Sequence, residues 1–133
     1  MILIIGGVYQ GKLEYSLNRF GLNKEDVYFC DMKDITIPTN KKIIYELEKW
    51  IFALVSSGCN VAEKITNLIE QNLSTIIICN DISCGVVPID KELRIWREEV
   101  GRATGTIAQN STEVVRLYCK IPTRIKYTQT TSK

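Results

Sequence analysis

The sequence predicts an α/β fold in which a mainly parallel sheet is flanked by helices. Short apolar runs alternate with longer segments whose apolar residues recur at helical spacing, an order that favours parallel strands joined by right-handed crossovers. Two of the runs are apolar at nearly every position, as expected of strands that are covered on both faces. The 133 residues suit one hydrophobic core, so we expect a single domain over residues 1–126 and a flexible polar tail over residues 127–133.

Four apolar runs are the predicted strands. They cover residues 2–5, 27–30, 75–79 and 114–119. The segment 32–38 stays open, because Ile35 and Ile37 alternate with polar residues and allow a brief extra strand.

The first two predicted helices lie between these strands. The first, residues 12–20, follows a glycine-rich segment directly and ends before Gly21, a residue suited to the left-handed position after a helix. The second is capped by Thr39 and ends at Gly58. Its apolar stripe consists of Ile43, Ile44, Leu47, Trp50, Ile51, Leu54 and Val55.

Two further helices are predicted in the second half of the chain. One is capped by Asn60, and the other covers about residues 90–108. Gly101 and Gly105 weaken the latter and suggest close packing against a neighbour. This helix carries three arginines, Arg94, Arg97 and Arg102. They form a solvent-exposed face paired with nearby glutamates, or one of them contacts a phosphate or a subunit interface.

Composition limits the classes of function. The net charge of +2 is too small to indicate a nucleic-acid or membrane surface, and no apolar run approaches the roughly 20 residues that span a bilayer, so we expect neither partner. The five cysteines are odd in number and match no zinc spacing, which favours a reducing, cytoplasmic location. The sequence contains no histidine, so no histidine of this chain can act as a base, nucleophile or metal ligand.

A phosphate-binding loop is predicted directly after the first strand. Residues 6–13 read Gly-Gly-Val-Tyr-Gln-Gly-Lys-Leu and match the first seven positions of the pattern G-x-x-x-x-G-K-[ST]. Glycine lets successive backbone N–H groups converge on a phosphate, and the lysine supplies a positive charge at the start of a helix. The predicted nucleotide-binding residues are therefore Gly6, Gly7, Val8, Tyr9, Gln10, Gly11, Lys12 and Leu13.

Leu13 stands where the pattern has a hydroxyl that binds Mg²⁺. Mg²⁺ also accepts phosphate, water and carboxylate ligands, so this change weakens metal binding without excluding it. Asp31 and Asp81 follow the second and third predicted strands, at the sheet edge where α/β proteins bind ligands. The predicted catalytic residues are Lys12, Asp31 and Asp81, with ATP or GTP as the ligand, together with Mg²⁺.

Several stretches of the second half resemble the motifs of one enzyme family. Residues 80–88 read Asn-Asp-Ile-Ser-Cys-Gly-Val-Val-Pro, and residues 94–102 read Arg-Ile-Trp-Arg-Glu-Glu-Val-Gly-Arg. With residues 1–12, 111–115 and 121–126, they resemble, in order, motifs of the bifunctional adenosylcobinamide kinase/adenosylcobinamide-phosphate guanylyltransferase family of cobalamin biosynthesis. The resemblance covers about residues 1–31 and 75–126.

The resemblance implies a reduced, RecA-like phosphate-loop NTPase fold. It also implies a nucleoside triphosphate on the loop, a cobinamide-type small molecule as a further ligand, and a homo-oligomer. The family carries GMP on a histidine during guanylyl transfer, and this sequence has none, so that step is not expected here. An acidic residue at a strand end, which the family also has, finds a candidate in Glu46, but we interpret its segment as helix.

Three hypotheses of function follow from the sequence. The first is a kinase-type phosphotransferase that acts on a cobinamide-like alcohol with ATP or GTP. The second is a non-catalytic nucleotide- or phosphate-binding protein derived from the same family, and the third is a self-associating remnant. Leu13 and the short chain favour the second and third, whereas the retained Gly6, Gly11 and Lys12 favour the first and second.

Overall fold

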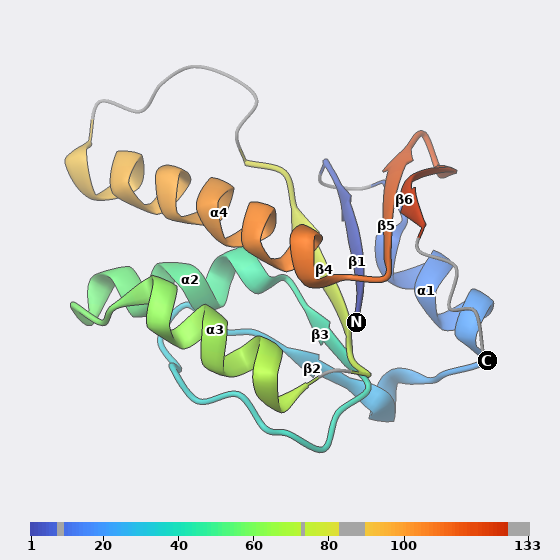
Figure 1. Ribbon diagram of the computed structural model, residues 1–133, viewed down its shortest axis with the longest axis horizontal. Coiled ribbons are helices and arrows are strands. Elements are labelled where there is room, and N and C mark those ends of the chain that lie inside the picture. Colours follow the sequence, from blue (N-terminus) through green and yellow to red (C-terminus); the bar gives the residue numbers. More distant parts are fainter. Residues whose placement is uncertain (8–9, 73, 83–89, 128–133) are drawn as a thin grey trace.

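The computed structural model describes residues 1–7, 10–72, 74–82 and 90–127. Within these ranges, six strands form one sheet and four α-helices flank it (Figure 1). The strands are β1 (Ile2–Gly6), β2 (Val27–Phe29), β3 (Ile43–Tyr45), β4 (Ile76–Asn80), β5 (Glu113–Tyr118) and β6 (Ile121–Tyr127). The helices are α1 (Lys12–Phe20), α2 (Leu47–Ser56), α3 (Val61–Gln71) and α4 (Lys91–Asn110), with a short 3₁₀ turn η1 (Lys24–Asp26).

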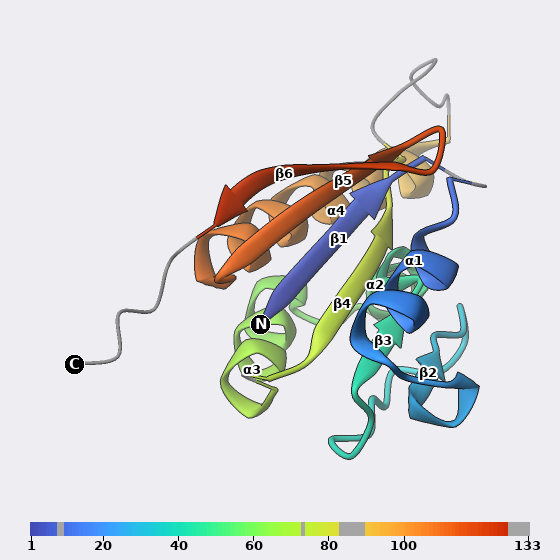
Figure 2. The same cartoon turned by 90° about the vertical axis from the view of Figure 1, so that its right-hand side faces the viewer.

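The sheet has the strand order β2-β3-β4-β1-β5-β6 and is parallel except for β6. The carboxyl ends of β1 to β5 therefore lie along one edge. Helices α2, α3 and α4 cover one face of the sheet, and α1 packs on the other (Figure 2). This confirms the predicted α/β class, and the architecture is that of a reduced phosphate-loop NTPase-like fold.

The core explains the two most apolar strands. Successive side chains of a strand point to opposite faces, so a strand covered on both faces is apolar throughout. In β1, Leu3 packs in the cluster under α2, α3 and α4, and Ile4 packs in the cluster under α1. In β4, Ile77 and Ile78 divide in the same way, and all four of these side chains are at most 1% exposed.

The predicted helix over Ile43 and Ile44 was wrong. These residues form β3, and α2 begins only at Leu47, so Thr39 caps no helix. Ile43 and Ile44 are fully buried on opposite faces, and a short, wholly apolar strand cannot be distinguished from the start of a buried helix by periodicity. The apolar residues of β3 and α2 together follow one helical spacing, so the sequence did not reveal where the strand ends and the helix begins.

The other helix boundaries predicted from capping residues are confirmed. Gly21 follows α1 with a φ of 63°, and the side chain of Asn60 accepts a hydrogen bond from the backbone N–H of Glu63 at the start of α3. The structure adds a cap that was not predicted, since the side chain of Asp90 accepts hydrogen bonds from the first backbone N–H groups of α4. The close packing expected of Gly101 and Gly105 was wrong within the described residues, since a Cβ at either position would meet no atom within 4 Å.

The edge strand β6 was not predicted as a strand. It pairs antiparallel with β5 through a two-residue turn, and Tyr127, assigned to the tail, is its last residue. Residues 128–133 lie outside the described ranges, so the flexible tail stays a prediction for them. Segment 32–38 forms no strand. Among the helices described, none is both long and apolar enough to cross a membrane.

Candidate functional site

The predicted phosphate loop leaves the sheet at Gly6 and is held there from two sides. The backbone N–H of Asp81 donates to the carbonyl of Gly6 over 2.8 Å, which ties the loop to the end of β4. On the β5 side, a Cβ added to Gly6 would lie 2.6 Å from the carbonyl oxygen of Leu117. With a φ of 155°, this position admits no side chain without moving β5.

Lys12 lies inside the loop. Its side chain is buried, and Nζ donates a hydrogen bond to the carbonyl of Gly7. Burial lowers the pKa of Lys12, while the carboxylates of Glu48 and Glu46 act in the opposite direction. Gly11 precedes α1 with a φ of 79° and, as glycine, has no side chain with which to cap the first N–H groups of the helix. A helix start of this kind, next to a buried lysine, favours an anion.

A cavity of about 390 Å³ lies against the loop. It brings together the start of α1, the end of β3, the end of β4 and the β5–β6 turn. The lining residues are Gly11, Lys12, Leu13, Glu14, Tyr45, Glu46, Asn80 and Lys120. This volume falls in the range of small-molecule sites.

Glu46 is an acid at the carboxyl end of β3 and lines this cavity. Its backbone is left-handed, with a φ of 61°, and its Oε1 accepts a hydrogen bond from Lys49 Nζ over 3.1 Å. The strand β3 is separated from the loop strand β1 by β4 alone. Our interpretation of this acid as part of a helix was therefore wrong: Glu46 lies directly after β3 and before the first residue of α2.

Glu48 is a buried carboxylate that sequence analysis missed. Its Oε1 accepts the backbone N–H of Asn80 over 3.0 Å, and its Oε2 accepts the side-chain amide of Asn80 over 2.6 Å. The indole of Trp96 donates to the backbone carbonyl of Glu48 over 2.8 Å. Glu48 thus joins α2, the end of β4 and α4. Its one sequence signal was an acid between Leu47 and Trp50 on an apolar stripe.

The two predicted aspartates lie in different surroundings. Asp31 is exposed, its Oδ1 accepts the backbone N–H of Lys33 over 2.9 Å, and it does not line the loop cavity. Asp81 lines a second cavity of about 170 Å³ between the sheet edge and α4, together with Asn80 and Arg97. Asn80 lines both cavities, so it forms the wall between them. The structure therefore places Asp81 next to the loop site and Asp31 away from it.

The remaining loop residues are held by packing and one hydrogen bond. Leu13 is partly buried, packs against the apolar cluster under α1 and also lines the loop cavity. The side-chain oxygen of Gln10 accepts the backbone N–H of Cys119, so the loop is attached to the β5–β6 turn. Val8 and Tyr9 lie outside the described residues.

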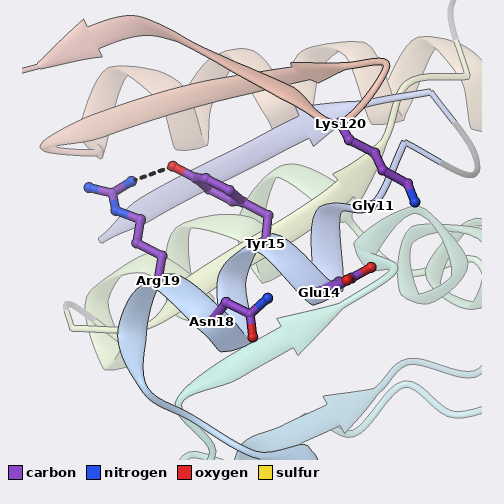
Figure 3. A pocket seen from close by; sticks show the side chains of 6 residues that line it. All are labelled: Gly11, Glu14, Tyr15, Asn18, Arg19 and Lys120. Carbon is purple, nitrogen blue, oxygen red and sulfur yellow. Dashed lines mark hydrogen bonds between the residues drawn. The ribbon is translucent and has the colours of Figure 1, made fainter.

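A third cavity, of about 430 Å³, runs along α1 from the loop (Figure 3). Its lining residues are Gly11, Glu14, Tyr15, Asn18, Arg19 and Lys120. Arg19 donates to the hydroxyl of Tyr15 over 3.1 Å and to the carboxylate of Glu113 over 2.6 Å. This cavity shares Gly11, Glu14 and Lys120 with the loop cavity, so the two adjoin.

Metal ligands are sparse in this region. Within the described ranges, no three histidine, cysteine or acidic side chains gather closely enough to hold an ion. A divalent cation at this edge would therefore take most of its ligands from phosphate and water, with a carboxylate such as Glu46 beyond them.

The fold and the position of the loop define a phosphate-loop NTPase-like protein, and comparison with known proteins gives the family. The model of the family described as cobinamide kinase/cobinamide phosphate guanyltransferase matches residues 32–125. This match spans more than half of the chain, so the protein belongs to that family, which acts in cobalamin biosynthesis. No curated protein matches the chain. The matched range includes β3 with Glu46 and begins after the predicted phosphate loop. The interpretation of residues 6–13 as a phosphate loop therefore depends on their own sequence and geometry.

Proposed function

We propose that this protein binds a nucleoside triphosphate at the loop cavity and transfers its terminal phosphoryl group to a cobinamide-type alcohol. The observation that carries the proposal is that one cavity is lined by both Lys12 and Glu46. Phosphoryl transfer needs positioned positive charge and a carboxylate near the metal more than it needs covalent chemistry. The loop, the start of α1 and the end of β3 supply these groups.

Each residue has a distinct part in this proposal. Lys12 and the first N–H groups of α1 bind the phosphates and stabilise the charge that develops on the transferring group. Glu46 would hold Mg²⁺ through water, since Leu13 offers no oxygen. Asp81, in the adjoining cavity, accepts the proton of the acceptor hydroxyl.

The reaction follows from this arrangement. The acceptor hydroxyl oxygen attacks the γ-phosphorus, the bond from that phosphorus to the bridging β–γ oxygen breaks, and the hydroxyl proton goes to Asp81. The nucleoside diphosphate leaves. The cavity that holds Asp81, at about 170 Å³, accommodates the hydroxyl-bearing end of an acceptor and not a whole tetrapyrrole. Guanylyl transfer by way of a histidine is not part of the proposal, because the sequence contains none.

The assay is transfer of the labelled γ-phosphate of ATP or GTP to adenosylcobinamide. We expect turnover by the wild type, a loss of about 100-fold or more in Lys12→Ala, and a loss of about tenfold or more in Glu46→Gln and Asp81→Asn. Asp31→Asn is the matched control, because this carboxylate is exposed and lies away from the cavity; it should keep wild-type activity. Wild-type protein that binds nucleotide but transfers no phosphate would reject the kinase function.

A second candidate function is supported by the packing of Leu13. Its side chain packs against the apolar cluster under α1 and offers no oxygen to a metal. This favours a protein that binds nucleotide without transferring phosphate. Saturable binding of ATP or GTP, unaffected by Mg²⁺ and without turnover, is the result that would select this function over the first.

A further inference from the structure

The turn between β5 and β6 has a strained backbone. Its two residues, Cys119 and Lys120, have φ values of 51° and 63°. A two-residue hairpin turn with positive φ at both positions normally contains glycine or asparagine, because a Cβ crowds the backbone in this conformation. Backbone strain of this kind persists only where the surrounding structure holds it, and it gathers at functional sites.

Both residues of the turn are fastened to the phosphate loop. The backbone N–H of Cys119 donates to the side-chain oxygen of Gln10. The Cγ of Lys120 lies 3.2 Å from the position that a Cβ on Gly11 would occupy, so the hydrocarbon part of the side chain packs against the Gly11 backbone. The hairpin therefore presents Lys120 to the loop in a fixed place.

Lys120 stands where two cavities meet. It lines the loop cavity, with Lys12 and Glu46, and also the cavity along α1, with Tyr15 and Arg19. Figure 3 shows its side chain reaching from the turn past Gly11 towards the first turn of α1. Within the described ranges no carboxylate forms an ion pair with its ammonium group. A cation in this place adds to the charge of Lys12 and the helix start.

We propose that Lys120 is a second phosphate-binding cation of this site. The inference rests on the proposed nucleotide binding and extends it: Lys12 holds the phosphate chain from within the loop, and Lys120 holds it from the β5–β6 turn. The nucleoside then extends into the cavity along α1. Glu14 also lines both cavities, so the two lysines offset its charge as well. At position 120, glycine would relieve the backbone strain but would also remove the cation.

Two glycine substitutions separate the backbone from the charge. Lys120→Gly relieves the strain and removes the cation, whereas Cys119→Gly relieves the strain and keeps it. Both variants should melt at a higher temperature than the wild type in the absence of nucleotide. Lys120→Asn, which tolerates positive φ, removes the cation while keeping a side chain.

Nucleotide affinity is the deciding readout, measured by calorimetric titration with ATP, ADP and AMP and with the corresponding guanine nucleotides. We expect Lys120→Gly and Lys120→Asn to weaken triphosphate binding about tenfold or more, and the loss to shrink from triphosphate to monophosphate. Their affinity should also depend less on salt than that of the wild type. Cys119→Gly should stay within about twofold of the wild type.

Two results would count against the proposal in different ways. If the wild type binds nucleotide and both Lys120 variants bind it equally well, Lys120 is not a phosphate ligand, and the proposed function stands without it. If the wild type binds none of the six nucleotides, the proposed function fails, and the role of Lys120 fails with it.

Discussion

Two turns at the same edge of the sheet are built differently. The phosphate loop places glycine where its backbone leaves the usual conformations, at Gly6 and Gly11. The β5–β6 turn adopts left-handed backbone at Cys119 and Lys120, neither of which is glycine. The loop therefore has residues that suit its geometry, whereas the turn keeps side chains that its geometry disfavours.

The difference shows two ways in which a chain can surround a phosphate site. In the loop, we infer that the backbone itself binds the phosphate, so a residue without a side chain is the suitable one. In the turn, we infer that a side chain is the ligand, and the backbone accepts strain to hold it. Substitutions should therefore have opposite effects on the stability of the two turns.

The largest expected effect is on the loop. Gly6→Ala would place a methyl group 2.6 Å from the carbonyl oxygen of Leu117 and force β1 and β5 apart. We expect a loss of about 3 kcal/mol or more in the free energy of unfolding, measured by urea denaturation. Gly21→Ala is the control: this residue also has positive φ but meets nothing within 4 Å, and should lose about 1 kcal/mol. Equal losses in the two variants would contradict the steric account.

The next effect tests the buried hydrogen bonds between Glu48 and Asn80, which lie behind the loop. Glu48→Ala removes the acceptor of both the backbone N–H and the side-chain amide of Asn80. We expect a loss of about 2–4 kcal/mol in thermal or urea unfolding, because both donors stay buried without a partner. Glu46→Gln, in the same segment but partly exposed, should change stability by less than about 1 kcal/mol. If Glu48→Ala lowers the free energy of unfolding as little as Glu46→Gln does, the carboxylate of Glu48 does not stabilise this part of the fold.

A smaller effect concerns Glu113, which anchors the hairpin. Its carboxylate, 5% exposed, pairs with Arg19 on α1 over 2.6 Å and with Arg124 on β6 over 3.1 Å. Glu113→Gln should lose about 1–2 kcal/mol at pH 7. Glu99→Gln, which breaks an exposed pair with Arg102, should lose less than about 0.5 kcal/mol.

The stabilisation by the Glu113–Arg19 ion pair depends on pH, and the sign of that dependence follows from the pKa of Glu113. The hydrogen bond from Arg19 holds the pKa of Glu113 below its ordinary value of 4.5. The unfolded state then binds more protons, so this stabilisation is complete above pH 4.5 and is lost as the pH falls through the native pKa. The difference in unfolding free energy between wild type and Glu113→Gln should therefore shrink below pH 4.5. A difference that stays constant down to pH 3 would show that the charge of Glu113 is not what stabilises the fold.

The smallest effect is a gain. Cys119→Gly removes a Cβ from left-handed backbone and adds chain entropy to the unfolded state, for a net stabilisation of about 0.5–1 kcal/mol. Urea denaturation at equal protein concentration measures it. A loss of stability in this variant would contradict the claim that the β5–β6 turn, unlike the loop, has a strained backbone.

The features that could be predicted from sequence are those with a local physical signature. The apolar run of β1 and the caps at Gly21 and Asn60 are determined by neighbours along the chain, and each was found. Residues 43–46 were not, because β3 is three residues long, buried on both faces and continuous with the stripe of α2. Local spacing does not distinguish that strand from a helix.

Long-range contacts were the other limit. Glu48 accepts a hydrogen bond from Asn80, 32 residues away, and the side chain of Lys120 packs against Gly11 at the opposite end of the chain. Asp31 and Asp81 were predicted by the same rule, that acids follow parallel strands, yet only Asp81 lines a cavity beside the loop. The rule places both acids at one edge of the sheet, but it does not say which of them lies beside the loop.

The most direct test of the account is calorimetric titration of the wild type with ATP and GTP, with and without Mg²⁺, beside Lys12→Ala and Lys12→Met. The methionine variant keeps the buried volume of the side chain, and Lys33→Ala, at an exposed lysine, is the control. We predict saturable binding by the wild type and Lys33→Ala, and affinity at least about tenfold weaker in both folded Lys12 variants. Unchanged affinity in these variants, or no binding of either nucleotide by the wild type, would contradict a phosphate site at this loop.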